Sequence, residues 1–257
     1  AVRTSMFRLA KEGWLVAEPV GRRSYYRLTE VGRHRCEAAH GRIYFRSLGS
    51  WDRHWTVVAT NLPGLEAKAG EALRRDLRWL GFGQLASGVM LHPEPDGAAV
   101  RQAIADAGLA DRALVMRAVA EEWVDPNVFQ EAIRASWDLD RVAAGYTEFI
   151  DAFGPVARAV RNGGALDPET CFALRTLVMH AYRRVLLRDP KLPDELLSPD
   201  WPGLAAQDLC RDLYRRVAGP AERHLSDVLE TPDGAASEAH PSYLTRFGGL
   251  RPSGKAA

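Results

Sequence analysis

The sequence predicts an α+β fold in three parts, followed by a flexible tail. Residues 1–46 have the pattern of a helix, a hairpin and a second helix; residues 51–122 alternate strands and helices; residues 127–230 carry apolar stripes at helical spacing. Residues 231–257 are rich in Gly, Pro, Ser and Ala, a composition that indicates a tail without stable structure. A chain of 257 residues is long enough for two or three small domains, which agrees with this division.

The bulk composition excludes several classes of protein. No stretch approaches the roughly 18 consecutive apolar residues that a membrane span requires, and the first residues lack the apolar core of a signal peptide. The three cysteines, Cys36, Cys171 and Cys210, share no metal-ligand spacing. We therefore expect a reduced, cytoplasmic protein with no metal, no cofactor and no membrane partner.

Positive charge is concentrated at the N-terminus. Residues 1–46 contain ten Lys and Arg against four Glu, whereas the whole chain has a formal net charge of only +1. A basic end on an otherwise acidic chain predicts a polyanionic partner for that end. The alternative is an Arg-rich surface that is simply solvated.

Residues 2–46 have the pattern of the second half of a winged helix-turn-helix. The first helix, 2–11, places Met6 and Leu9 on one face, and Gly13 is suited to end it. Two β-prone runs then flank a glycine turn whose tip carries adjacent arginines, which predicts a hairpin. A helix of about 10 residues fits the major groove of DNA, and a cationic ribbon reaches the adjacent backbone. The two helices that open such a domain are absent, so we expect the native N-terminus to be longer.

The candidate DNA contacts follow from this pattern. Arginine can bond bidentately to guanine, and Lys or Ser can hold a phosphate. The expected contacts are Arg3, Thr4, Ser5, Arg8 and Lys11 on the helix, and Arg22, Arg23 and Tyr25 on the hairpin. A solvated helix face and an ordinary polar turn are the alternatives.

The middle part has the ferredoxin-like βαββαβ order. The pattern predicts strands over 55–60, 82–92 (broken by a turn at 86–88) and 113–120, and helices over 65–80 and 97–107. We expect a dimerisation or coupling module. The alternative is a metal-dependent nuclease, but that chemistry usually needs clustered carboxylates, and the first strand ends at Thr60 and Asn61.

The C-terminal part is predicted to be all-α, and one of its helices carries charge into an apolar stripe. Arg175 lies at the edge of that stripe near Tyr182, where an unpaired charge is costly. It either holds an anionic ligand or meets a structural acid such as Asp189 or Asp138. Arg183 and Arg184 follow on the same helix, where they either form an anion patch or solvate the helix end.

Four runs of the sequence occur together in the order typical of one family of regulators. They are Val2-Arg3-Thr4 through Gly13-Trp14-Leu15, Gly21-Arg22-Arg23-Ser24-Tyr25-Tyr26-Arg27-Leu28-Thr29, Leu77-Arg78-Trp79-Leu80-Gly81-Phe82-Gly83 with His92-Pro93, and Arg175 through Trp201-Pro202-Gly203. In these runs the chain resembles the PaaX family, bacterial regulators of phenylacetate catabolism, over about residues 1–228.

The resemblance implies a winged-helix DNA-binding domain, a ferredoxin-like middle domain and a helical C-terminal domain. It also implies a homodimer that represses transcription from operator DNA and is released by an aryl-acyl-CoA effector, typically phenylacetyl-CoA. For that effector, Arg175, Tyr182, Arg183 and Arg184 are the candidate contacts.

Enzyme motifs are missing from the sequence. It contains no His-Glu-x-x-His, no Gly-x-Ser-x-Gly and no phosphate-binding Gly-x-x-x-x-Gly-Lys, so we assign no catalytic residues. A transcriptional repressor is therefore the expected function. The alternatives are the nuclease described above and an acyl-CoA sensor or scaffold that does not bind DNA.

Overall fold

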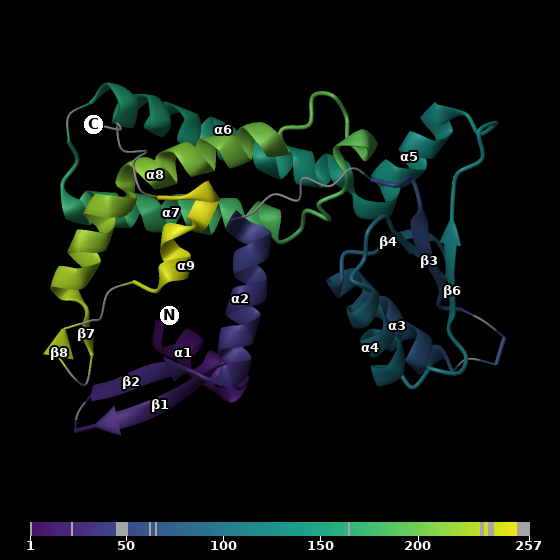
Figure 1. Cartoon of the computed structure of the whole chain (residues 1–257), viewed down its shortest axis with the longest axis horizontal. Coiled ribbons are helices and arrows are strands. Elements are labelled where there is room, and N and C mark those ends of the chain that lie inside the picture. The colour runs from purple at the N-terminus through teal and green to yellow at the C-terminus, as the bar shows by residue number, and fades with distance from the viewer. Residues whose placement is uncertain are drawn as a thin grey trace. The chain divides into compact units, whose positions relative to one another are not determined.

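The computed structural model describes residues 2–21, 23–44, 51–61, 63–64, 66–163, 165–231, 234–235 and 239–250. The fold is a mixed α+β fold, as predicted, and Figure 1 labels its elements. The chain forms two compact units: unit 1 comprises Ala1–Ser47, Ala152–Arg183 and Gln207–Ala257, and unit 2 comprises Leu48–Asp151 and Arg184–Ala206. The three domain boundaries drawn from the sequence stay a prediction.

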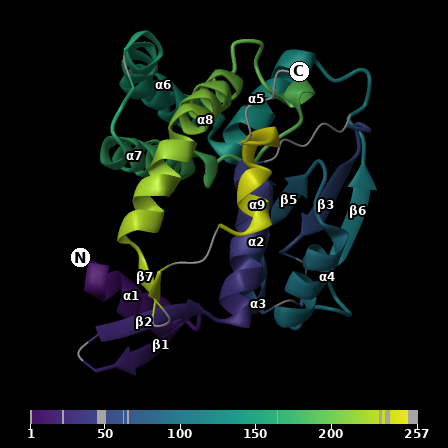
Figure 2. The ribbon, with the colours of Figure 1, turned by 60° about the vertical axis from the view of Figure 1, so that its left-hand side comes forward.

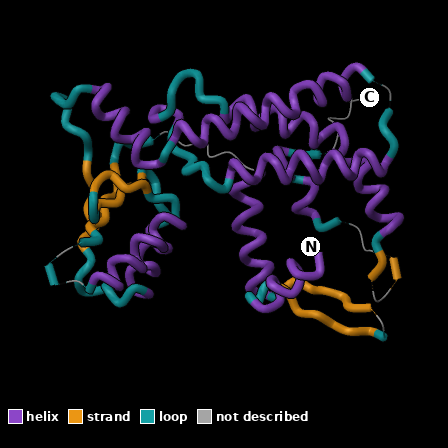
Figure 3. The backbone as a smooth tube through the Cα atoms, turned by 180° about the vertical axis from the view of Figure 1, so that it is seen from behind, coloured by secondary structure: helices purple, strands orange, loops and turns teal. Residues whose placement is uncertain are grey.

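Unit 1 opens with the predicted helix, hairpin and helix, visible in Figure 3 as two orange strands between purple helices. Its first elements are α1 (Val2–Lys11), β1 (Leu15–Val20), β2 (Arg23–Leu28) and α2 (Glu30–Tyr44). Its later part contains the C-terminal part of α6 (Leu139–Asn162) from Ala152 onward, and most of α7 (Pro168–Leu186) and α8 (Gly203–Val228). These are followed by β7 (Glu230–Thr231), β8 (Gly234–Ala235), α9 (Pro241–Leu244) and η2 (Arg246–Gly248).

The junction between α1, the hairpin and α2 is set by short-range contacts around Trp14. Gly13 has a positive φ of 74°, and the N–H groups of Gly13 and Trp14 bond back to the carbonyls of Ala10 and Leu9, which closes α1 as predicted. The hydroxyl of Thr29 caps α2 by accepting from the N–H of Gly32 at 3.0 Å. A Cβ on Gly32 would lie 2.2 Å from the Trp14 carbonyl oxygen, so only glycine allows α2 to begin here.

The segment 239–250 lies within the region where the sequence predicts a flexible tail, yet it forms α9 and η2 and packs on α8 within unit 1. Phe247 is buried, and its carbonyl accepts a hydrogen bond from Arg215 at 2.7 Å. The Tyr243 hydroxyl donates to the Ala218 carbonyl of α8 at 3.2 Å. Two aromatic side chains therefore anchor a segment whose composition alone suggests disorder. Residues 251–257 lie outside the described residues.

Unit 2 is built on one antiparallel sheet, and its elements follow one another in the order that the sequence predicts. They are β3 (Trp55–Ala59), α3 (Ala67–Trp79), β4 (Gly83–Ala86), β5 (Val89–His92), α4 (Gly97–Asp106) and β6 (Leu114–Ala118), followed by α5 (Pro126–Trp137), the start of α6, and η1 (Asp194–Leu196). The strand order is β4-β5-β3-β6, which makes β3 a central strand and β6 an edge strand.

The central strand β3 is packed on both faces, and its successive residues point to opposite sides of the sheet. On one side Val58 packs against Leu73 and Leu77 of α3, the helix that lies with α4 on that side of the sheet in Figure 2. On the other side Trp55 packs against Ile133 of α5 and Leu196 of η1. Unit 2 thus has two hydrophobic cores that share the strands β3 and β5.

In the part of the chain that the structure describes, no helix is long and apolar enough to cross a lipid bilayer.

A substitution at Gly83 can test how α5 packs on this sheet. A Cβ at this position would lie 2.5 Å from the Trp137 indole, which is itself held by a 2.8 Å hydrogen bond from Nε1 to the Gly81 carbonyl. We expect Gly83→Ala to lower the free energy of unfolding by about 1–3 kcal/mol, measured by urea denaturation with circular dichroism. Gly97→Ala, whose added Cβ would meet only ordinary contacts, is the matched control. Equal midpoints for the two variants would refute this packing.

Candidate nucleic-acid interface

The surface of α1 presents the polar side chains that the sequence assigns to DNA. All five of them are exposed: Arg3, Thr4, Ser5, Arg8 and Lys11. The Nε of Arg8 lies 3.8 Å from a carboxylate oxygen of Glu12, but both side chains are largely in solvent, so the pair holds Arg8 only weakly. The inner face is formed by Met6 and Leu9, which are half-buried. The helix therefore offers one polar face to a partner.

The hairpin extends a second set of polar groups beside α1. β1 and β2 pair antiparallel in register from Leu15 with Leu28 to Val20 with Arg23, and Gly21 turns the chain with a φ of 60°. Tyr25 is half-buried and Tyr26 exposed, as alternation along a strand requires. Arg22 lies outside the described residues.

Arg23, the first residue of β2, has a partner that the sequence did not predict. Its guanidinium donates to a carboxylate oxygen of Glu230 in β7 at 2.5 Å, and this hydrogen bond raises the pKa of Arg23. Both side chains are 68% exposed, so solvent screens the pair. A polyanion that contacts Arg23 would compete with this carboxylate for the guanidinium. No local signal in the sequence joins these residues, which lie 207 positions apart.

Apolar side chains also face solvent on this module. Phe7 of α1 is 72% exposed, and Val20 and Val31 are each 54% exposed. Phe7 lies between Arg3 and Lys11 around the helix, so the exposed face of α1 is polar with one apolar side chain in it.

Arg175 in α7 meets an acid, but not the one that the sequence suggests. Its Nη1 donates to Glu222 of α8 at 2.7 Å and to the Tyr243 hydroxyl at 3.1 Å. Burial lowers the pKa of Arg175, but the Glu222 hydrogen bond and the neighbouring Tyr243 outweigh it and leave the pKa raised. Asp189 instead accepts from the Tyr146 hydroxyl at 2.6 Å. The charge of Arg175 is thus compensated within the protein.

The other three candidate effector residues differ in exposure. Tyr182 is buried in the core, whereas Arg183 and Arg184 are exposed on α7. The sequence did not identify Glu222 or Tyr243 as partners of Arg175. The apolar residues Tyr243, Leu244 and Phe247, at helical spacing, are the signal in this segment that marks an anchored turn.

Metal-binding groups do not gather anywhere in the described part of the chain. No cluster of three or more His, Cys, Asp and Glu side chains occurs there. Cys36 is exposed, while Cys171 and Cys210 are buried and burial raises the pKa of both thiols.

Three family models match the chain in sequence order. A PaaX-like protein model matches residues 1–32, the PaaX protein central Cas2-like domain matches 48–129, and the PaaX-like protein C-terminal domain matches 137–227. The Transcriptional repressor PaaX of Escherichia coli (strain K12) is 35% identical over 250 residues, which cover 97% of this chain and 78% of that protein. The chain belongs to the PaaX family. The resemblance seen in the sequence is thereby confirmed.

The PaaX models follow the elements described above. The model of residues 1–32 covers α1 and the hairpin, and that of the central domain covers the whole β3–β6 sheet. Among solved structures, the uncharacterized protein Rv0674 from Mycobacterium tuberculosis is 22% identical, with a TM-score of 0.49 over 85% of this chain and 83% of that one.

The pairing of Arg175 predicts a structural role for this residue. We expect Arg175→Met to lower the free energy of unfolding by about 1.5–3 kcal/mol, because Glu222 and Tyr243 lose a charged hydrogen-bond donor. Arg183→Met, which removes an exposed arginine from the same helix, should change it by less than about 0.5 kcal/mol. Urea denaturation measures both. Equal stabilities for the two variants would show that the Glu222 contact does not hold Arg175.

Proposed function

We propose that this PaaX-family chain is a transcriptional repressor that binds operator DNA through α1 and the β1–β2 hairpin. In this proposal α1 is the recognition helix, the hairpin is the wing of a winged helix-turn-helix, and the protein acts as a homodimer in the cytoplasm. The contacts are Arg3, Thr4, Ser5, Arg8 and Lys11 of α1, and Arg22, Arg23 and Tyr25 of the wing.

One observation carries this proposal: the exposed polar face of α1 and the exposed Arg23 lie in the most basic segment of the chain. Ten Lys and Arg stand against four Glu in residues 1–46. Helix and ribbon are the two elements that enter or flank a DNA groove, and neutralised phosphates supply much of the affinity. The name of the E. coli relative, Transcriptional repressor PaaX, supports the same function.

The middle part has a supporting role in this proposal. Its β3-α3-β4-β5-α4-β6 order with strands arranged β4-β5-β3-β6 supports a ferredoxin-like domain. We assign it to dimerisation or to coupling between effector and DNA, since a two-fold repressor matches a palindromic operator.

The ion pair between Arg23 and Glu230 predicts that substitutions of its two residues change the affinity for DNA in opposite directions. With operator DNA selected from a random pool by the full-length protein, Arg23→Ala should reduce the slope of log affinity against log salt by about one unit. Glu230→Gln should tighten binding by roughly two- to fivefold, since it frees Arg23 from an exposed ion pair. Gel-shift titrations at several salt concentrations measure both.

Arg161→Ala, which removes an exposed arginine of α6, is the control and should leave both affinity and slope unchanged. If Arg23→Ala behaves like this control, the hairpin is not the wing. If the wild-type protein selects no DNA at all, the proposed function itself is wrong.

We further propose that an aryl-acyl-CoA releases the repressor from its operator. Exposed Arg183 and Arg184 suit the phosphates of such a ligand, with Arg175 and Tyr182 as the buried part of the same helix. A ligand shifts the equilibrium only if it prefers the DNA-free state, so the response requires differential binding.

This part of the proposal predicts a selective response to ligands. Phenylacetyl-CoA should release the wild-type repressor from operator DNA in a gel shift, whereas free phenylacetate should not. Arg183→Ala with Arg184→Ala should blunt the release yet leave operator affinity unchanged. Release by coenzyme A alone, to the same extent, would contradict recognition of the aryl group.

A further inference from the structure

Phe7 of α1 is an apolar side chain within a polar surface. It is 72% exposed, whereas Met6 and Leu9 of the same helix are half-buried. Because consecutive residues of an α-helix are about 100° apart, Phe7 lies on the side of α1 that is nearly opposite Leu9. Its neighbours one turn before and after are Arg3 and Lys11. The ring therefore stands near the centre of the face that the proposed function turns toward DNA.

The surroundings of Phe7 indicate what kind of partner its ring requires. A phenyl ring in water forgoes the free energy that burial of its apolar surface contributes, but exposure alone does not identify a site. Here Arg3, Arg8 and Lys11 are exposed cations on the same side of the helix, and Thr4 adds a hydroxyl group. A partner of this face must attract cations and also offer an apolar group to one ring.

Neither an apolar protein surface nor a small anion meets both requirements. Other exposed apolar side chains of the module, such as Val20 and Val31, belong to β1 and α2 and not to the outer face of α1. An apolar protein surface on Phe7 would therefore cover the cations beside it without pairing them, which is costly. A small anion would pair with the cations but would leave the ring in water.

The major groove of DNA supplies both kinds of group. Phosphates border it and attract Arg and Lys, and most atoms on the base edges are hydrogen-bond donors or acceptors. The exception is the C5-methyl group of thymine, which apolar side chains such as phenylalanine contact. Cytosine lacks that methyl group and presents an amino donor, from which a phenyl ring would displace water without replacing the hydrogen bond. A phenyl ring on this face thus distinguishes thymine from cytosine.

We propose that Phe7 is a specificity-determining residue whose ring packs against the C5-methyl group of one thymine in each half-site of the operator. The inference deepens the proposed function and rests on it, because the ring reaches a base only when α1 lies in the major groove. Arg3 and Lys11, on either side of the ring, contact phosphate or guanine. These cations supply affinity, and the ring adds selection for an A·T base pair at one position.

The test removes the methyl group and keeps the base pair. Operator DNA is selected from a random pool by the full-length protein, and each thymine of the half-sites is then replaced in turn by deoxyuridine, symmetrically in both half-sites. Gel-shift titrations at one salt concentration measure the affinities. We expect one such replacement to weaken wild-type binding by roughly fourfold per half-site, as the loss of one buried methyl group implies. Phe7→Ala should bind the thymine and uracil forms of that operator equally.

Two further variants show that the effect belongs to the ring. Val31→Ala, which removes an exposed apolar side chain of α2, is the matched control and should keep the full preference for thymine. Phe7→Leu, which keeps an apolar side chain, should retain part of that preference. Thermal melting shows that each variant is folded.

Three results would overturn the inference and leave the proposed function standing. They are a wild-type protein that binds every uracil operator as tightly as the thymine operator, a selected operator without thymine in its half-sites, and a Phe7→Ala variant that keeps the full preference for thymine. In the last case an equal loss of affinity for both forms would show that the ring makes a contact within the protein. A wild-type protein that selects no DNA removes the proposed function itself, and the inference with it.

Discussion

Unit 1 depends on one guanidinium that is stacked between aromatic rings. Arg246 lies 4.7 Å from the ring centroid of Tyr44 and 5.0 Å from that of Tyr243, and it donates to the Tyr214 hydroxyl at 2.8 Å. Each cation–π contact contributes about 0.5–2 kcal/mol. Because these tyrosines belong to α2, α9 and α8, a single side chain joins the helix behind the hairpin to the C-terminal helices.

The same cluster keeps its titratable groups neutral. Burial raises the pKa of both Tyr44 and Tyr243 to about 12, although Arg246 and Arg175 respectively oppose the shift. Burial, followed by the charge of Arg246, lowers the pKa of His40. Because these rings are neutral, the Arg246 guanidinium stacks on them and no second charged side chain has to be removed from water. The hairpin is thus linked to α8 in two ways, through α2 and this cluster, and through Glu230, which follows α8 and pairs with Arg23.

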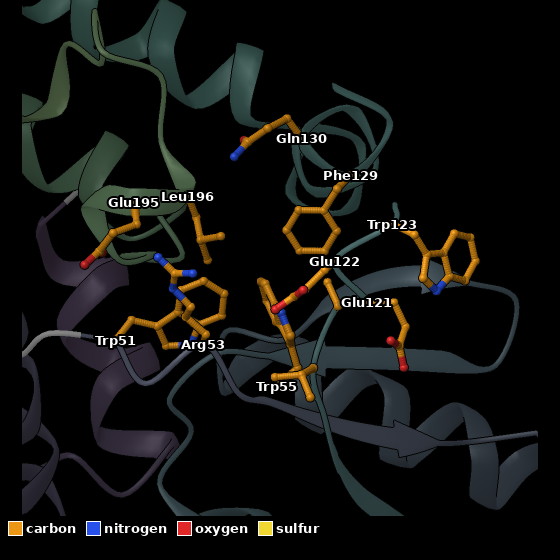
Figure 4. A pocket seen from close by; sticks show the side chains of 12 residues that line it. Trp51, Arg53, Trp55, Glu121, Glu122, Trp123, Phe129, Gln130, Glu195 and Leu196 are labelled. Atoms are coloured by element: carbon orange, nitrogen blue, oxygen red, sulfur yellow. The ribbon is translucent and has the colours of Figure 1, made fainter. Parts of the chain in front are cut away.

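In unit 2 the corresponding constraint is the position of β3 at the centre of the sheet. Its side chains serve two cores, with Val58 on the α3 side and Trp55 on the α5 side. A small residue, Gly83, lets the Trp137 indole approach the sheet, and this sets how closely α5 packs. Where aromatic rings from β3 and α5 meet η1 they do not fill the space completely, and a cavity lined by Trp55, Phe129 and Leu196 lies at that point (Figure 4). Packing of large rings therefore produces both the core and this cavity.

The sequence by itself determined the local elements: glycines at 13 and 21 end α1 and turn the hairpin, and apolar periodicity places the helices, because these features depend on backbone conformation and contacts a few residues apart. It also determined which residues of α1 face solvent. The partners of Arg23 and Arg175, the anchoring of 239–250, and the cavity beside Trp55 were decided only by tertiary structure. Each of them requires side chains brought together from distant positions, and their pairing depends on how helices and strands pack rather than on any local pattern.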